Sequence, residues 1–304
     1  MGVRGEESGL ARWTPAYASL GAALIASAVL TAALAATLAA AADKPLSFDH
    51  AATDKKIVAL TFDADMTPGM LSELRSKRVA SWYNEKVIAA LRQEHVPATL
   101  FMTGLWIEAY SDVTRELSAD PLFELGSHSY SHGAFHSPCY KLFPIAEAKQ
   151  ADEIAKTDVL LKTYTVSYKK YFRFPGLCYD AASAKKVTDQ GYAVIGGDVD
   201  GADAFVNSPK WTASDIVANV RPGSIVVLHM HGGRNAPDTA AALPETIKRL
   251  RAEGYTFVKV SDLLALPPGE PVKHFTGPPR QAAATPKGDN AEEQHWPFQH
   301  WFRQ

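Results

Sequence analysis

The sequence predicts an α/β fold whose parallel strands form a barrel or an open sheet. Short apolar runs typical of buried strands alternate about seven times with segments whose apolar residues recur at helical spacing. Polar side chains follow several of these runs directly, at the place where loops from parallel strands converge. The chain has 304 residues, 46% of them hydrophobic, which is enough for a large domain with a substantial core.

The first predicted strand, Ile57–Phe62, is the run around which the other elements are arranged. It is short, largely apolar and bounded by polar residues, which is typical of a strand covered on both faces. Two carboxylates, Asp63 and Asp65, follow it. Further strands are predicted at residues 97–102, 122–127, 171–174, 192–195, 224–228 and 255–260.

Segments with helical spacing of apolar residues lie between these strands, and residues 145–164 form the longest of them. Residues 66–81 are instead rich in Pro, Gly, Ser and charge, which predicts a loop with at most one helical turn. The other predicted helices cover residues 84–94, 107–119, 181–190, 213–220 and 239–253.

The overall charge argues against nucleic acid as a partner. The formal net charge is −2, whereas a nucleic-acid-binding protein needs a basic face or stripe. An acidic substrate is not indicated by the global charge either.

The N-terminal segment is predicted to direct export. Residues 16–42 carry no charge and consist mainly of alanine and leucine, and Arg4 and Arg12 precede them. Small residues before Asp43 offer sites for a signal peptidase, yet the run exceeds the usual ~7–15 apolar residues and could span a bilayer. Residues 1–42 are therefore predicted to be either a signal peptide or a membrane anchor. The protein would be periplasmic, held in the cell envelope, or secreted.

The two cysteines, Cys139 and Cys178, leave two alternatives open. In an oxidising compartment they could form a disulfide, but their spacing does not show that their Cα atoms approach closely enough. The alternative is a pair of buried free thiols.

Five polar clusters follow predicted strands, and loops at the carboxyl ends of barrel strands meet at one mouth. We therefore expect these side chains to lie close together, although each cluster alone would be a weak signal. The clusters are Asp63 with Asp65, His128 with His132, Arg173, Asp200 with Asp203, and His229 with His231.

The histidine pair predicts a metal site. His128 and His132 are four residues apart, which would place them on one side of a helical turn. Two histidines and a carboxylate with open coordination positions make a catalytic zinc site. We expect Asp63 and Asp65 to take different roles, one as the base that deprotonates water and the other as a metal ligand.

With these residues the sequence resembles the polysaccharide deacetylase family, which shares the NodB homology domain. The resemblance covers about residues 55–265 and rests on short motifs that occur in the family's order. It implies a distorted barrel of seven or eight β/α units. The matching motifs are Thr61-Phe62-Asp63, His128-Ser129-Tyr130-Ser131-His132, Arg173-Phe174-Pro175, Asp200-Gly201-Ala202-Asp203 and Val227-Leu228-His229.

The resemblance also implies catalytic roles. Asp63 would be the general base and His229 the general acid. Arg173 would orient Asp63, and Asp203 would hold His229. These roles agree with the general chemistry of the groups, because a carboxylate beside arginine stays ionised and a histidine beside a carboxylate has a raised pKa.

The metal ligands implied by the resemblance are His128 and His132, holding Zn²⁺ or another divalent metal such as Co²⁺. The family's Thr-Phe-Asp-Asp motif is altered here, because Ala64 occupies the second aspartate position. Asp65 is the expected replacement after a shift of one residue; the alternative is a metal held by two histidines and a weaker partner. Ala204 stands where the family has a tryptophan that helps to wall the acetyl pocket.

Three segments are predicted along the chain. Residues 1–42 are the signal peptide or anchor, and residues 43–265 are the catalytic domain implied by the resemblance. Residues 266–304, in which Pro, Gly and polar residues predominate, are predicted to be a flexible tail.

The predicted function is metal-dependent hydrolysis of the N-acetyl group from N-acetylated sugars of a polysaccharide or cell-wall glycan, releasing acetate. One alternative keeps the mechanism and changes the substrate, to deformylation or deacylation of a lipid-linked sugar or another small amide. A retained membrane anchor would favour it. The other alternative is a carbohydrate-binding protein with a weakened centre, which Ala64 and Ala204 favour.

Overall fold

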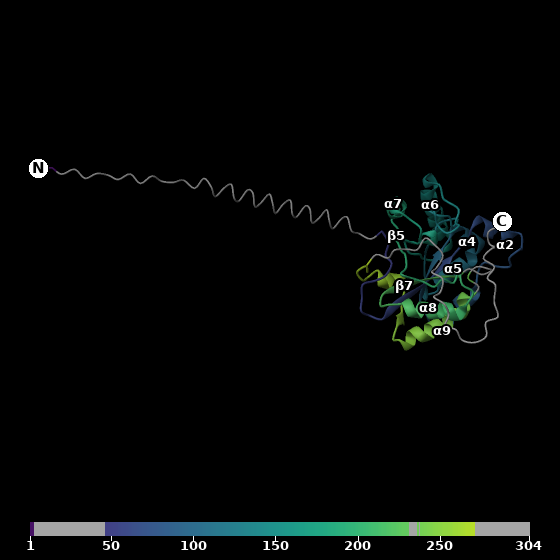
Figure 1. Cartoon of the computed structure of the whole chain (residues 1–304). Coiled ribbons are helices and arrows are strands. Elements are labelled where there is room, and N and C mark those ends of the chain that lie inside the picture. The colour runs from purple at the N-terminus through teal and green to yellow at the C-terminus, as the bar shows by residue number, and fades with distance from the viewer. Residues whose placement is uncertain (3–45, 231–235, 237, 271–304) are drawn as a thin grey trace. The chain divides into compact units, whose positions relative to one another are not determined.

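The computed structural model describes residues 1–2, 46–230, 236 and 238–270 (Figure 1). The predicted signal peptide or anchor therefore lies outside the described residues, as does most of the predicted tail. Within the described part of the chain, no helix is both long and apolar enough to cross a membrane. The first residues of the predicted tail, 266–270, are ordered: Pro268 forms a bridge with Ala51, and Gly269 donates a hydrogen bond to the carbonyl of His50.

The described strands form one eight-stranded sheet in which every pairing is parallel. The order is β5-β4-β3-β2-β1-β7-β6, with β8 also paired to β1. The two end strands do not pair with each other in the described part, so the sheet is an incompletely closed barrel. The strands are β1 (Ile57–Ala64), β2 (Ala98–Met102), β3 (Phe123–Ser127), β4 (Tyr171–Phe172), β5 (Ala193–Val194), β6 (Val199–Asp200), β7 (Ser224–His229) and β8 (Thr256–Phe257).

Helices connect the parallel strands, as parallel pairing requires. Figure 1 shows α8 and α9 running side by side, and these two helices share many contacts. The helices are α2 (Pro68–Arg75), α3 (Glu85–Gln93), α4 (Gly104–Ala109), α5 (Ser111–Ala119), α6 (Glu147–Tyr164), the 3₁₀ turn η1 (Pro175–Leu177), α7 (Ala181–Asp189), α8 (Pro209–Asn219), α9 (Thr239–Ala252) and α10 (Val260–Leu263).

Strand β1 is central because it is buried on both faces and pairs with three other strands. Its alternate residues Val58, Leu60, Phe62 and Ala64 belong to the main hydrophobic core. Thr61 is buried on the opposite face, and its hydroxyl donates to the carbonyl of Val226 at 2.6 Å. The predicted opening strand is thus confirmed, and it extends two residues further than Phe62.

The prediction of a loop over residues 66–81 was wrong, because α2 occupies Pro68–Arg75. Thr67 caps this helix by accepting a hydrogen bond from the backbone N–H of Met70, and Pro68 occupies its first turn. Met70 and Leu71 are buried. Composition pointed to a loop, whereas the cap and this short apolar pair stabilise a helix.

Two other segments differ from their predicted forms. The helix predicted at 107–119 is divided into α4 and α5, because Tyr110 adopts a non-helical conformation between them. Its hydroxyl accepts a hydrogen bond from the backbone N–H of Trp82 at 2.8 Å. The last predicted strand, 255–260, is shortened to β8 because α10 starts at Val260.

Candidate active site

The pairing of β1 with β7 places Asp63 opposite His229 at the carboxyl ends of the two strands. Asp65 follows one residue beyond the end of β1. The intervening Ala64 packs in the hydrophobic core, as strand alternation requires. The Asp-Ala-Asp sequence therefore puts two carboxylates on the polar side and a small apolar residue on the core side.

Asp65, His128 and His132 form a buried group that could hold a metal ion. One ligand atom from each residue lies within 4.8 Å of the other two. Nε2 of His132 is 3.2 Å and Nε2 of His128 is 3.4 Å from Oδ1 of Asp65. Two imidazole nitrogens and one carboxylate oxygen are a donor set that suits Zn²⁺ and leaves positions open for water and substrate.

The orientation of His128 fits a metal ligand. Its Nδ1 lies 2.9 Å from the backbone carbonyl oxygen of Arg173. A carbonyl oxygen only accepts, so Nδ1 carries the hydrogen and a neutral ring keeps its lone pair on Nε2, facing Asp65. Burial alone lowers the pKa of His128, but the nearby carboxylates of Asp63 and Asp65 raise it above the ordinary value. The cluster thus favours a positive charge at Nε2, which a bound cation would supply.

The segment that carries both histidines is a loop, so the prediction of a helical turn was wrong. Ser129 and His132 have positive φ angles of 66° and 58°, a conformation that costs energy for residues other than glycine. The hydroxyl of Ser129 accepts a hydrogen bond from the N–H of His132 at 3.2 Å. The two rings meet because the loop doubles back, with ring centroids 5.0 Å apart.

Glu153 of α6 stabilises the loop between His128 and His132 by accepting hydrogen bonds from it. Its Oε2 accepts hydrogen bonds from the backbone N–H groups of Tyr130 (3.0 Å) and Ser131 (2.8 Å), and its Oε1 accepts from the Ser131 hydroxyl at 2.9 Å. Sequence reasoning missed this residue. The only available signal was an acidic side chain on the stripe of α6 that also carries Ile154, Thr157 and Leu161, all of which are buried.

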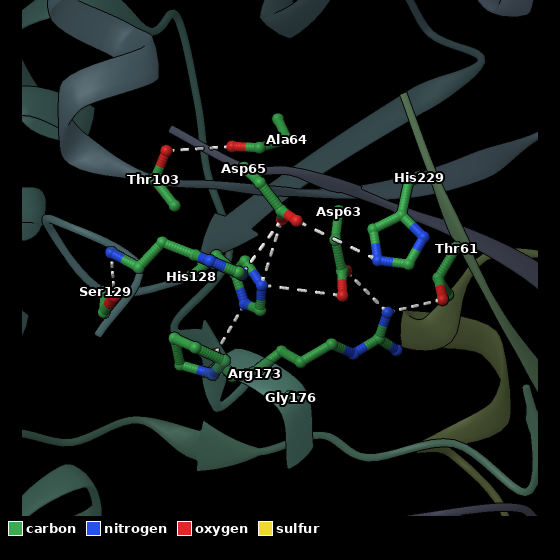
Figure 2. A network of polar contacts seen from close by, with 12 residues as sticks. Thr61, Asp63, Ala64, Asp65, Thr103, His128, Ser129, Arg173, Gly176 and His229 are labelled. Atoms are coloured by element: carbon green, nitrogen blue, oxygen red, sulfur yellow. Dashed lines mark hydrogen bonds and ion pairs between the residues drawn. The ribbon is translucent and has the colours of Figure 1, made fainter. Parts of the chain in front are cut away.

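Arg173 is fully buried behind Asp63. Its Nη1 donates to Oδ1 of Asp63 at 2.9 Å and to the hydroxyl of Thr61 at 2.7 Å (Figure 2). Its Nη2 donates to the carbonyl of Gly196 at 2.7 Å, and its guanidinium lies 4.1 Å from the centroid of the Phe101 ring. Burial lowers the pKa of Arg173, which Asp63 partly offsets. The Asp63 carboxylate is therefore held in one orientation by a buried cation.

Asp203 holds His229 in the same way from the other side of the site. Its Oδ1 lies 2.7 Å from Nδ1 of His229, and its Oδ2 accepts from the backbone N–H of His229 and from the hydroxyl of Thr239. Burial alone lowers the pKa of His229, but Asp203 chiefly raises it to about 10. Nε2 of His229 faces Asp65 and lies 3.9 Å from Oδ2 of that residue (Figure 2).

A pocket of about 250 Å³ opens onto these groups.

Cys139 and Cys178 form a disulfide with Cα atoms 5.8 Å apart, which shows that the first of the two alternatives for the cysteines is correct. The disulfide ties together two segments of the pocket wall, because Tyr140 follows Cys139 and Leu177 precedes Cys178. The residues that line the 250 Å³ pocket are Asp63, Asp65, Thr67, Met70, His128, His132, Tyr140, Leu142, Gly176, Leu177, Asp200, Ala204, Phe205, Val227 and His229.

The structure brings together Asp63, Asp65, His128, His132, Arg173, Asp203 and His229, all of the residues predicted for the site. Asp200 lines the pocket. In the described part of the chain its side chain accepts a hydrogen bond from the N–H of Ala202 and forms none with Asp203 or His229. His136 lies apart and is exposed, with its Nδ1 3.2 Å from Asp180. His231 lies outside the described residues.

Residues 50–195 match the family model described as polysaccharide deacetylase. Over these residues the chain resembles the polysaccharide deacetylase family. A polysaccharide deacetylase from Bacillus cereus, named peptidoglycan-N-acetylglucosamine deacetylase, is 27% identical over 217 residues, which cover 69% of this chain and 89% of the relative.

Solved structures share the fold. The Bc1960 peptidoglycan N-acetylglucosamine deacetylase superposes with a TM-score of 0.63 at 22% identity, covering 76% of this chain and 98% of that one. BA3943, described as a CE4 family pseudoenzyme from Bacillus anthracis, superposes with a TM-score of 0.59 at 23% identity, covering 73% of this chain and 69% of that one. The predicted fold, a distorted barrel of the polysaccharide deacetylase family, is confirmed.

Proposed function

We propose that the protein is a metal-dependent N-deacetylase that removes acetyl groups from N-acetylated sugars of a cell-wall glycan or another polysaccharide. The observation that supports this most is the arrangement around one pocket: a potential metal group, a carboxylate held by arginine, and a histidine held by aspartate. The name of the Bacillus cereus relative supports peptidoglycan as the substrate class.

Asp65, His128 and His132 would hold Zn²⁺ or another divalent metal such as Co²⁺. When bound, such a metal would polarise the acetamide carbonyl and lower the pKa of water. The donor set fits this ion because its three atoms converge and because Nδ1 of His128 is already engaged by a carbonyl.

Asp63 would act as the general base. Its Oδ1 is engaged by Arg173, while its Oδ2 faces the metal group, 3.6 Å from Nε2 of His128. A water molecule between these groups would transfer its proton to Asp63 as its oxygen attacks the carbonyl carbon. Arg173 and Thr61 would act as positioning residues.

His229 would act as the general acid. Its Nδ1 is fixed by Asp203, so Nε2 is the atom that gives a proton to the sugar nitrogen as the C–N bond breaks. The products are acetate and a free amino group on the sugar. The raised pKa of His229 keeps the ring protonated at neutral pH, as an acid requires.

The proposed substrate supports a location of the protein outside the cytoplasm, because a cell-wall glycan lies outside it. The uncharged residues 16–42 would deliver the domain, either as a cleaved signal peptide or as an anchor. The mass of the mature N-terminus distinguishes these two forms. A retained anchor would favour a lipid-linked sugar as the substrate.

The test is acetate release from N-acetylglucosamine oligomers and from peptidoglycan by protein loaded with zinc or cobalt. Release should stop with a chelator and return with metal. Asp63→Asn should lower the rate by about 10²–10⁴-fold while metal content is retained. His136→Ala is the matched control, because His136 is an exposed histidine outside the pocket.

Absence of acetate from every such glycan, with one metal bound per chain, would contradict the proposal. Retained affinity for the same glycans would then favour the carbohydrate-binding alternative. Ala204 favours that alternative, because a small side chain lines the pocket at this position.

A further inference from the structure

Phe205 is a large apolar residue exposed at the pocket mouth. Its relative exposure is 42%, and it lines the pocket beside Ala204. It belongs to a tight turn, in which its N–H donates to the carbonyl of Ala202 at 2.9 Å. No step of the proposed hydrolysis uses it.

The ring of Phe205 is held by Tyr140. The two ring centroids are 5.4 Å apart and the planes are inclined by 30°. Tyr140 is itself confined, because it follows the disulfide-bonded Cys139 and packs on Gly176, where an added Cβ would lie 3.0 Å from the tyrosine ring. The two rings therefore form an aromatic shelf at the pocket mouth whose position is set by covalent and packing contacts.

A carboxylate lies on the same wall. Asp200 lines the pocket together with Tyr140 and Phe205, and its Oδ1 accepts a hydrogen bond from the N–H of Ala202 at 2.8 Å. In the described part of the chain, no other hydrogen bond or ion pair engages this side chain. Asp200 is exposed at the end of β6, so its carboxylate is open to a ligand at the pocket mouth.

The pocket is small for a polymer. Its volume of about 250 Å³ is below the ~300–1,000 Å³ typical of sites for drug-sized ligands. A space of this size would accommodate the reacting acetamide and part of its sugar, so the neighbouring sugars of a bound polymer would lie against the rim. A pyranose offers an apolar C–H face and hydroxyl donors, which match an aromatic ring and a carboxylate.

We propose that Phe205 and Asp200 form a binding subsite for a sugar next to the one being deacetylated, with the ring packed on Phe205 and a hydroxyl donating to Asp200. This inference rests on the proposed function and specifies how the polymer is recognised. It makes these two residues determinants of glycan specificity.

The experiment compares kcat/KM for an N-acetylglucosamine pentamer with kcat/KM for p-nitrophenyl acetate, which has an acetyl group and no sugar. Phe205→Ala should lower the ratio of the two constants roughly tenfold, mainly through KM for the pentamer. Asp200→Asn should lower it about threefold to tenfold. Phe205→Tyr, which keeps an aromatic ring, should restore most of the ratio.

Phe143→Ala is the matched control, because Phe143 is 40% exposed but does not line the pocket. It should keep the wild-type ratio. If wild type deacetylates the pentamer and Phe205→Ala and Asp200→Asn both keep the wild-type ratio, the subsite is wrong while the proposed function stands.

If wild type releases no acetate from the pentamer, from peptidoglycan or from the other glycans tested, the proposed function fails, and pentamer binding measured by calorimetry decides on the subsite. Affinity that falls in Phe205→Ala but not in Phe143→Ala supports it. Equal affinity in both variants, or no binding by wild type, overturns it.

Discussion

The backbone carbonyl oxygen of Arg173 lies 2.9 Å from Nδ1 of His128, while the guanidinium of the same residue binds Asp63. One residue thus orients both a proposed metal ligand and the proposed base, through different atoms. The carbonyl contact is independent of the side chain, so substitution of Arg173 should separate the two effects.

Arg173→Lys should lower kcat about 100-fold or more while zinc content is retained. A lysine cannot reproduce the forked contacts to Thr61, Asp63 and Gly196, so Asp63 loses its fixed orientation. Loss of part of these buried hydrogen bonds should also lower the free energy of unfolding by about 1–3 kcal/mol. Acetate release, metal analysis and denaturant unfolding measure the three quantities. Wild-type kcat in Arg173→Lys would refute the role given to the pair.

Glu153→Ala should weaken zinc binding by about 10–100-fold, because the loop between His128 and His132 loses the acceptor of its backbone N–H groups. Glu153→Gln should lose less, since an amide oxygen still accepts both bonds. Glu108→Gln is a control from the same neighbourhood, because within the described residues the Glu108 side chain accepts a hydrogen bond only from the Tyr130 hydroxyl. Competition with a zinc-binding dye gives the affinities. Equal affinity in Glu153→Ala and wild type would show that the loop holds its shape unaided.

Replacing Cys139 and Cys178 together by alanine should lower the free energy of unfolding by about 2–4 kcal/mol, because the disulfide closes a loop between residues 39 positions apart. KM for glycan should rise as well, since the bonded segments carry Tyr140 and Leu177 of the pocket wall. Urea unfolding with and without dithiothreitol provides the measurement. Wild type should respond to the reductant and the double variant should not; an unresponsive wild type would contradict this role.

Asp158 should stabilise the fold in a pH-dependent manner. Burial alone raises its pKa, but hydrogen bonds from Lys162, Lys170, Tyr192 and Tyr168 hold it well below the ordinary value of 3.8. A depressed pKa gives stability that is fully present above the unfolded value and is lost as the pH falls below it. Asp158→Asn should therefore cost about 1–3 kcal/mol at pH 7.

The difference between Asp158→Asn and wild type should shrink below about pH 4. Unfolding by urea at pH 7, 5 and 3 measures it. Asp152→Asn is a control, because Asp152 pairs only with the exposed Lys149 in the described structure. A difference that stays constant across these pH values would contradict the account.

The sequence predicted the sheet well because strand burial leaves a direct pattern. The apolar run before Asp63 and the run ending at Leu228 are confirmed as neighbouring strands β1 and β7. The convergence of the polar clusters was also predictable, because the carboxyl ends of parallel strands share one edge of the sheet. Helix α2 was missed because its stability comes from the Thr67 cap and tertiary burial of Met70.

The supporting contacts of the site could not be read from the sequence. Glu153 reaches the histidine loop from a helix more than twenty residues away, and the left-handed conformation of Ser129 has no signature in a Ser residue. The partner of Cys139 likewise depended on tertiary distance. Such contacts follow from the folded arrangement, whereas periodicity reports only the nearest neighbours along the chain.

The central claim is that Asp65 is a metal ligand. Position 64, directly after the proposed base Asp63, is an alanine and cannot supply a carboxylate, so the proposed metal site depends on Asp65. Acetate release by wild type and Asp65→Ala, measured while zinc is titrated into metal-free protein, tests it most directly. Wild-type activity should rise with zinc and reach its maximum at one ion per chain, whereas Asp65→Ala should bind zinc far more weakly and stay inactive at that ratio. Wild-type zinc affinity and wild-type acetate release in Asp65→Ala would contradict the account.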